Sequence, residues 1–138
     1  MSFVPQGGPP STAFGALFPG ELHSLAYAVG NGELFWPAAV GTRVAEVIAE
    51  AGLGIYGGEV YVGRGRTWGN IELEWLTDPG WLPDEEWSDF VSRALGQAVV
   101  AIEQAEKLAH LPELQYEREP MCFFACYTER EYPAELRG

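Results

Sequence analysis

The sequence predicts an α+β domain, in which a small antiparallel sheet of about three to five strands carries one long and one shorter helix on one face. Three observations support this prediction. Apolar residues recur at helical spacing in two segments, near 37–51 and 84–110. Residues 71–76 alternate between apolar and polar side chains, as half-buried strands do. Residues 121–127 form an almost unbroken apolar and aromatic run, typical of a central strand.

A chain of 138 residues fits one domain and leaves little room for two. We expect residues 1–20 to form a flexible arm, because the Gly-Gly-Pro-Pro run at 7–10 stops regular structure. Phe14, Leu17 and Phe18 are apolar enough to dock the end of this arm on the body. The body, residues 21–138, is expected to be a single α+β domain.

The first part of the body allows two interpretations. Residues 21–36 alternate weakly around Asn31-Gly32, a tight-turn dipeptide, which fits a short hairpin. A short helical turn fits the same residues nearly as well. From Pro37 onward, Val40, Val44 and Ile48 follow helical spacing, and Gly52 is a suitable end for that helix.

A hairpin is expected next. Residues 55–62 read as one strand, residues 63–66 as the turn and residues 71–76 as the antiparallel partner, which Asp78-Pro79-Gly80 ends.

The longest helix is predicted from Asp84 to His110. Its start is acidic, which the helix dipole favours, and Pro112 prevents its continuation. Trp87, Phe90 and Ile102 belong to its apolar stripe.

The charge balance limits the classes of partner that this protein can bind. Eight basic against twenty acidic residues give a net charge of −12, which disfavours nucleic acid and anionic membranes as partners. The sequence has no apolar run that could span a membrane and no basic residue before Arg43, so we expect a cytoplasmic protein. A basic protein, or a neutral and apolar one, is the expected partner.

The sequence matches known cofactor-binding, metal-binding and catalytic motifs only weakly. The G-x-G-x-x-G letters from Gly52 to Gly57 follow a helix and precede a strand, the reverse of a dinucleotide site. Cys122 and Cys126, four apart in a strand, would lie about 13 Å apart, too far for a disulfide or a shared zinc ion. His23 and His110 lack partners for a catalytic triad. We therefore expect no cofactor, no metal and no catalytic residues.

A surface of acidic and aromatic side chains is the candidate site. If the helices cover the face of Val60 and Leu73, then Glu59, Tyr61, Glu72 and Glu74 share the open face. Trp68 lies in a flanking loop, where an exposed aromatic side chain could anchor a partner. Trp81 lies in the loop on the other side, and for both tryptophans packing beneath the loop is as plausible as anchoring a partner.

Between Gly54 and Ala105 the sequence resembles the immunity protein 40 family of bacterial polymorphic toxin systems. The resemblance rests on Ile55-Tyr56-Gly57-Gly58-Glu59-Val60-Tyr61, on Thr67-Trp68-Gly69-Asn70 and on Phe90-Val91-Ser92-Arg93, with Phe123-Phe124-Ala125 as a closing strand. The chain departs from the family pattern at Glu59, Gly69, Ile71 and Ala94, and residues 1–20 and 128–138 have no counterpart.

This resemblance implies an antitoxin that binds a cognate toxin and occludes it stoichiometrically, without chemistry of its own. Charge alone points to a basic toxin, for instance a nuclease, because an acidic inhibitor can mimic phosphates. Two alternatives stay open: a small hydrolase that uses Glu59, Glu72 and Glu74, and a structural subunit whose aromatic residues form an oligomer interface. Either a monomer or a homodimer is compatible with the sequence.

Overall fold

The computed structural model describes residues 3–30, 32–64, 67–109 and 120–138. Within these segments the fold is α+β, as predicted. The strands and α-helices are β1 Val4–Pro5, α1 Gly20–His23, β2 Tyr27–Ala28, β3 Leu34–Pro37, α2 Gly41–Glu50, β4 Gly54–Arg64, β5 Thr67–Leu76, α3 Trp87–Ala109 and β6 Met121–Tyr127. Short 3-10 turns cover 15–17, 38–40 and 134–136.

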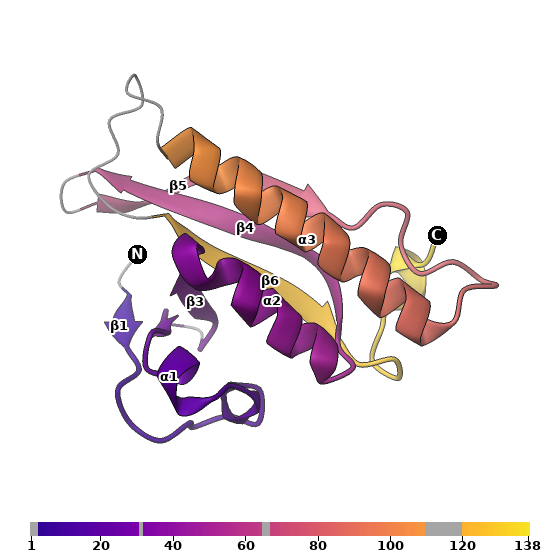
Figure 1. Ribbon diagram of the computed structural model, residues 1–138, viewed down its shortest axis with the longest axis horizontal. Coiled ribbons are helices and arrows are strands. Elements are labelled where there is room, and N and C mark those ends of the chain that lie inside the picture. Colours follow the sequence, from indigo (N-terminus) through magenta and orange to yellow (C-terminus); the bar gives the residue numbers. More distant parts are fainter. Residues whose placement is uncertain (1–2, 31, 65–66, 110–119) are drawn as a thin grey trace.

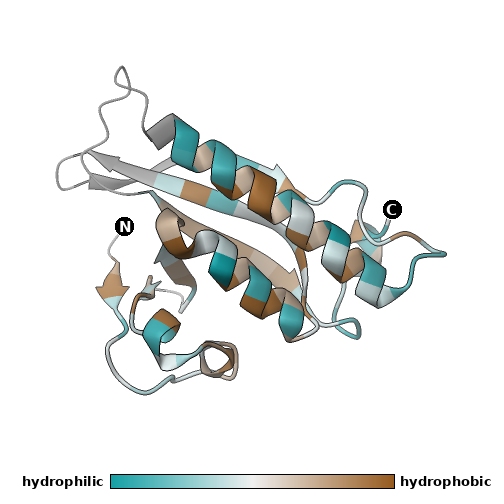
Figure 2. Ribbon diagram, in the orientation of Figure 1, coloured by the Kyte–Doolittle hydropathy of each residue, from teal (hydrophilic) through white to brown (hydrophobic). Residues whose placement is uncertain are grey.

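The described strands form one antiparallel sheet of six, in the order β1-β2-β3-β6-β4-β5. Strand β6, although it comes last in the chain, lies between β3 and β4. Helices α2 and α3 lie side by side on the same face of the sheet (Figure 1). Polar and apolar residues alternate along both helices (Figure 2), as expected where one helix face packs on a sheet.

The sheet is larger than the predicted three to five strands, because β1 lies in the segment that was expected to be a flexible arm. Strand β1 is only two residues long, too short to leave a period in the sequence. Both interpretations of residues 21–36 hold in part: α1 is the short helical turn, and β2 and β3 form the hairpin.

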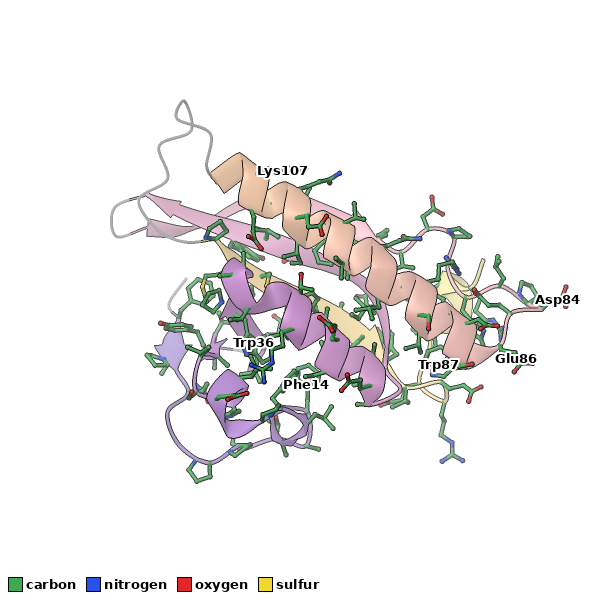
Figure 3. The ribbon with its side chains drawn as sticks, in the orientation of Figure 1. Phe14, Trp36, Asp84, Glu86, Trp87 and Lys107 are labelled. Atoms are coloured by element: carbon green, nitrogen blue, oxygen red, sulfur yellow. The ribbon has the colours of Figure 1, made fainter. Side chains whose placement is uncertain are left out.

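The main core lies between the sheet and the two helices. Trp36, Phe90, Ile48, Ile55 and Ile102 are almost completely buried there. The segment before residue 20 also reaches this core. Phe18 is 4.6 Å from Trp36 between ring centroids, and Phe14 is 6.4 Å from it; Figure 3 shows Phe14 beside Trp36. Leu17, by contrast, is 41% exposed.

Helix α3 begins at Trp87, three residues later than predicted. Residues 82–86 instead form a turn that the side chain of Glu85 stabilises by accepting a hydrogen bond from the backbone N–H of Leu82. Asp84 and Glu86 point outward at this end of the helix, and Lys107 lies near the other end (Figure 3). His110, the predicted last residue, lies outside the described segments.

The C-terminal segment closes the end of the core near Trp87. Tyr132 is 8% exposed and contacts the rings of Trp81, Trp87 and Phe90. The last residue is also fixed, because the Gly138 N–H donates to the carbonyl of Trp81 at 3.0 Å. None of the helices in the described segments is both long and apolar enough to cross a membrane.

Candidate partner-binding face

The face of the sheet opposite the helices carries acidic and aromatic side chains from β4, β5 and β6. Glu59 pairs directly with Glu74 across β4 and β5, and with Phe123 across β4 and β6. Val60, the next residue of β4, is 1% exposed and belongs to the core beneath the helices. Since successive side chains of a strand alternate between faces, Glu59, Glu74 and Phe123 share the open face. We call it the acidic–aromatic face.

Tyr61, two residues after Glu59, points to the same face, but neighbouring side chains bury it. Its side chain is 9% exposed and packs with Phe35 and Met121 in a second, smaller cluster. Its hydroxyl donates a hydrogen bond to Glu59 Oε2 at 2.5 Å. This bond fixes the direction of the Glu59 carboxylate, since a buried ring leaves its hydroxyl little freedom to move.

The electrostatics of Tyr61 show how closely carboxylates surround it. Burial, the hydrogen bond to Glu59 and the charges of Glu59, Glu33 and Glu74 raise the pKa of Tyr61 to about 12. Burial is the largest of these causes. Glu33, which follows β2, is thus a third acidic residue near the face. Sequence patterns did not connect Glu33 to this face, because it lies beside a turn dipeptide and far from β4 and β5 in the chain.

Of the five residues predicted for the interface, the structure brings Glu59, Tyr61 and Glu74 together. Trp68 and Glu72 lie on β5, but their side chains fall outside the described residues. Trp68 is within a strand and not in a flanking loop as predicted, because the β4–β5 ladder continues through the Gly63–Trp68 pair. Of the turn expected at 63–66, Gly63 and Arg64 belong to β4, and residues 65–66 lie outside the described residues.

Two hollows flank Tyr56, which stacks on Tyr127 at 5.1 Å between ring centroids. The larger hollow, of about 710 Å³, lies between Glu74 and the C-terminal segment. The smaller, of about 380 Å³, includes Glu33 and Phe123 in its lining. Burial and the neighbouring Tyr127 raise the pKa of Tyr56, so its hydroxyl stays neutral at physiological pH. The face therefore offers aromatic rings beside carboxylates.

Trp81 is not an exposed anchor. Its ring packs edge-on against Trp87 at 4.8 Å between centroids, and its indole N–H donates to the backbone carbonyl of Glu85 at 2.8 Å. Packing beneath the loop, one of the two interpretations of this residue, is therefore the correct one.

The glycines of the Gly-Gly-Glu-Val-Tyr segment serve packing. A Cβ on Gly58 would lie 2.6 Å from Cζ2 of Trp75 and 2.5 Å from the carbonyl oxygen of Phe123. A Cβ on Gly57 would lie 2.5 Å from the carbonyl oxygen of Trp75. Both positions therefore need a residue without a side chain, whereas Glu59 between these glycines and Val60 points away from the core.

Arg93, the last residue of the Phe-Val-x-Arg segment, also has a structural role. Its guanidinium donates to both carboxylate oxygens of Glu85, at 2.8 and 2.9 Å, and to the carbonyls of Pro79 and Gly80. The hydrogen bonds from Arg93 lower the pKa of Glu85. Arg93 thus connects α3 to the loop that follows β5.

The described residues contain neither a disulfide nor a metal-ligand cluster. Cys122 is buried, and its thiol lies 3.3 Å from the Trp36 carbonyl. Burial, followed by the charge of Glu131, raises the pKa of Cys126 to about 12. No group of three or more potential metal ligands occurs in the described part of the chain.

Comparisons of the chain with protein-family models, with curated proteins and with solved structures gave no match.

Proposed function

We propose that this protein is a cytoplasmic immunity protein of the immunity protein 40 type, which binds a cognate bacterial toxin and neutralises it by stoichiometric occlusion. The acidic–aromatic face is the proposed binding surface, with Glu59, Tyr61, Trp68, Glu72 and Glu74 as its main residues. The toxin is proposed to be basic at its contact surface, and a nuclease fits that description. No catalytic step by this chain is part of the proposal.

The observation that carries the proposal is the Glu59–Glu74 pair. Like charges directly opposite each other on one sheet face destabilise the fold by about 0.2–1 kcal/mol. The ion pairs that the described residues form are Arg43–Glu21 and Arg93–Glu85, and neither involves Glu59 or Glu74. A basic partner would supply a counter-charge, so an unfavourable feature of the free protein becomes favourable in the complex.

The hydrogen bond from Tyr61 adds preorganisation. Because it holds the Glu59 carboxylate before binding, less side-chain entropy is lost when a partner docks. The net charge of −12 acts at longer range, where it raises the association rate with a basic partner and makes that rate sensitive to salt.

The test begins with a tagged pull-down from the source cells, with salt titration and mass spectrometry. The captured protein is then expressed in bacteria, with and without this chain, and cell growth is measured. Rescue of growth at equimolar expression is the expected result. Capture of a partner that is harmless to cells would contradict the proposal.

Charge reversal locates the surface. Glu74→Lys, alone or with Glu72→Lys, should weaken capture, whereas Glu46→Lys makes the same charge change at an exposed position of α2, on the helix side of the sheet. Losing an attraction and gaining a repulsion, each of about 1 kcal/mol, weakens binding about thirtyfold for Glu74→Lys. Equal effects of Glu74→Lys and Glu46→Lys would remove this face from the proposal.

A further inference from the structure

The outer edge of β5 is open along the described part of the chain. Strand β5 pairs with β4 and ends the strand order, so no other described strand covers its second edge. It is ten residues long, and Leu76 at its end is 67% exposed. The edge of such a strand presents N–H and C=O groups that can pair with another chain.

A groove runs beside this edge, between β5 and α3. Its volume is about 410 Å³, and Trp75 and Leu76 line it from the strand. On α3, Gly96, Val100 and Gln104 line it at helical spacing. A Cβ on Gly96 would meet no atom within 4 Å, and Val100 is 52% exposed, so the groove has room for side chains.

The dimensions suit a short extended segment. The lining of α3 runs from Arg93 to Gln104, about 16 Å of helix axis. About five residues of an extended strand span the same length. Helix α3 follows the direction of β4 and β5 (Figure 1), so a strand added to β5 would run along the groove.

We propose that the edge of β5 receives an extended basic segment of the partner as an additional strand. This inference rests on the proposed function, because it states how the same partner docks. Side chains of an added strand alternate between the two faces. One set would lie beside Glu74 on the acidic–aromatic face, and the other set would enter the groove next to Trp75.

Charge favours a basic segment of the partner, rather than a second copy of this chain, at the edge of β5. Pairing β5 with β5 of another copy would bring together two edges that each carry Glu74, in molecules of net charge −12. Like charges opposite each other oppose such a pair. Lysine or arginine side chains on the added strand would instead offset the Glu59–Glu74 repulsion. Because Glu74 lies on β5 itself, the acidic–aromatic face continues to this edge.

The test uses the peptide acetyl-Lys-Val-Lys-Val-Lys-amide as the probe and the full-length, isotopically labelled chain. Nuclear magnetic resonance spectra should show shifts at the amides of Leu73–Leu76 and of Gly96–Gln104. The same peptide N-methylated at every residue keeps its charge but loses backbone donors, so it should not produce these shifts. A Glu-Val peptide of equal length should also fail to bind.

Two variants at Gly96 provide a matched pair. Gly96→Leu fills the groove, whereas Gly96→Ala gives the same gain in helix propensity and leaves most of the groove open. Gly96→Leu should weaken the peptide about tenfold relative to Gly96→Ala, the effect of losing one buried apolar side chain. Melting temperatures of both variants confirm that the fold is intact.

Several results would overturn strand addition. These are equal binding of the N-methylated peptide, shifts confined to Glu59 and Phe123, no shifts at millimolar peptide, or a dimer in sedimentation that Gly96→Leu abolishes. If Glu74→Lys abolishes toxin neutralisation while Gly96→Leu leaves it intact, strand addition is refuted and the proposed function stands. If the edge binds the peptide but the wild-type chain protects no cell, the proposed function fails and the edge site remains.

Discussion

The packing of Gly58 predicts a large effect for a small substitution. In Gly58→Ala the new methyl group would lie 2.6 Å from Trp75 Cζ2 on one side and 2.5 Å from the Phe123 carbonyl oxygen on the other. The carbonyl belongs to β6, the neighbouring strand, and cannot withdraw without disturbing the ladder. Overpacking of this kind costs about 1–3 kcal/mol. We expect a loss of about 2 kcal/mol in the free energy of unfolding.

The corresponding change in melting temperature follows from chain length. For 138 residues the entropy of unfolding near 60 °C is about 0.29 kcal/mol/K, so Gly58→Ala should lower the melting temperature by about 7 °C. Gly96→Ala is the control, because its methyl group meets no atom within 4 Å. It should raise the melting temperature by about 3 °C through helix propensity.

Thermal unfolding followed by circular dichroism measures both shifts, and urea titration checks the free energies. In the double variant Gly58→Ala/Trp75→Leu the ring atoms that crowd the methyl group are gone, so the combined loss should be smaller than the sum of the single losses. The packing argument is wrong if Gly58→Ala melts within a degree of the wild type or if the two losses simply add.

Three further predictions concern other parts of the molecule. Arg93→Ala should cost about 1–3 kcal/mol, because Glu85 and two loop carbonyls lose their donor; hydrogen exchange in residues 78–85 should accelerate, whereas no acceleration would contradict the role of Arg93. Cys126 is only partly buried, but its pKa is raised to about 12, so it should react with a thiol reagent at pH 8 much more slowly than free cysteine does; reaction of the native protein at the rate of free cysteine would refute the raised pKa. The pKa of Tyr61 lies above its unfolded value, at about 12, so its contribution to stability is complete below about pH 10 and disappears as the pH rises to about 12. Glu59→Gln should lower this pKa, as the absorbance of tyrosinate in a pH titration reports; an unchanged titration would exclude the hydrogen bond as a cause.

The elements with strong periodicity could be predicted from the sequence. The continuous apolar run at 121–127 also predicted the bounds of β6 correctly. Such a run does not alternate, because a strand in the middle of a sheet is covered on both faces. Residues 71–76 alternate and form part of β5. The prediction that Glu59 and Glu74 share one face assumed only that Val60 is buried beneath the helices. The observed β4–β5 register and the burial of Val60 confirm it.

The sequence did not reveal features that depend on distant contacts. Glu33 reaches the acidic–aromatic face only because β2 and β3 join the sheet. Tyr61 was expected on the surface, but Phe35 and Met121 bury it, and neither lies near it in the chain. Helix α3 also begins later than predicted, because the Glu85 side chain bonds to Arg93 and to the backbone N–H of Leu82 in a turn that precedes the helix.

The position of β6 has a consequence for biosynthesis. Strand β6 joins β3 to β4 in the sheet, yet it follows every other described strand in the chain. While the ribosome is still translating residues before Met121, the two parts of the sheet have no strand to connect them, and the nascent chain exposes the edges of β3 and β4. Folding of this sheet can therefore be completed only after residues 121–127 have been synthesised.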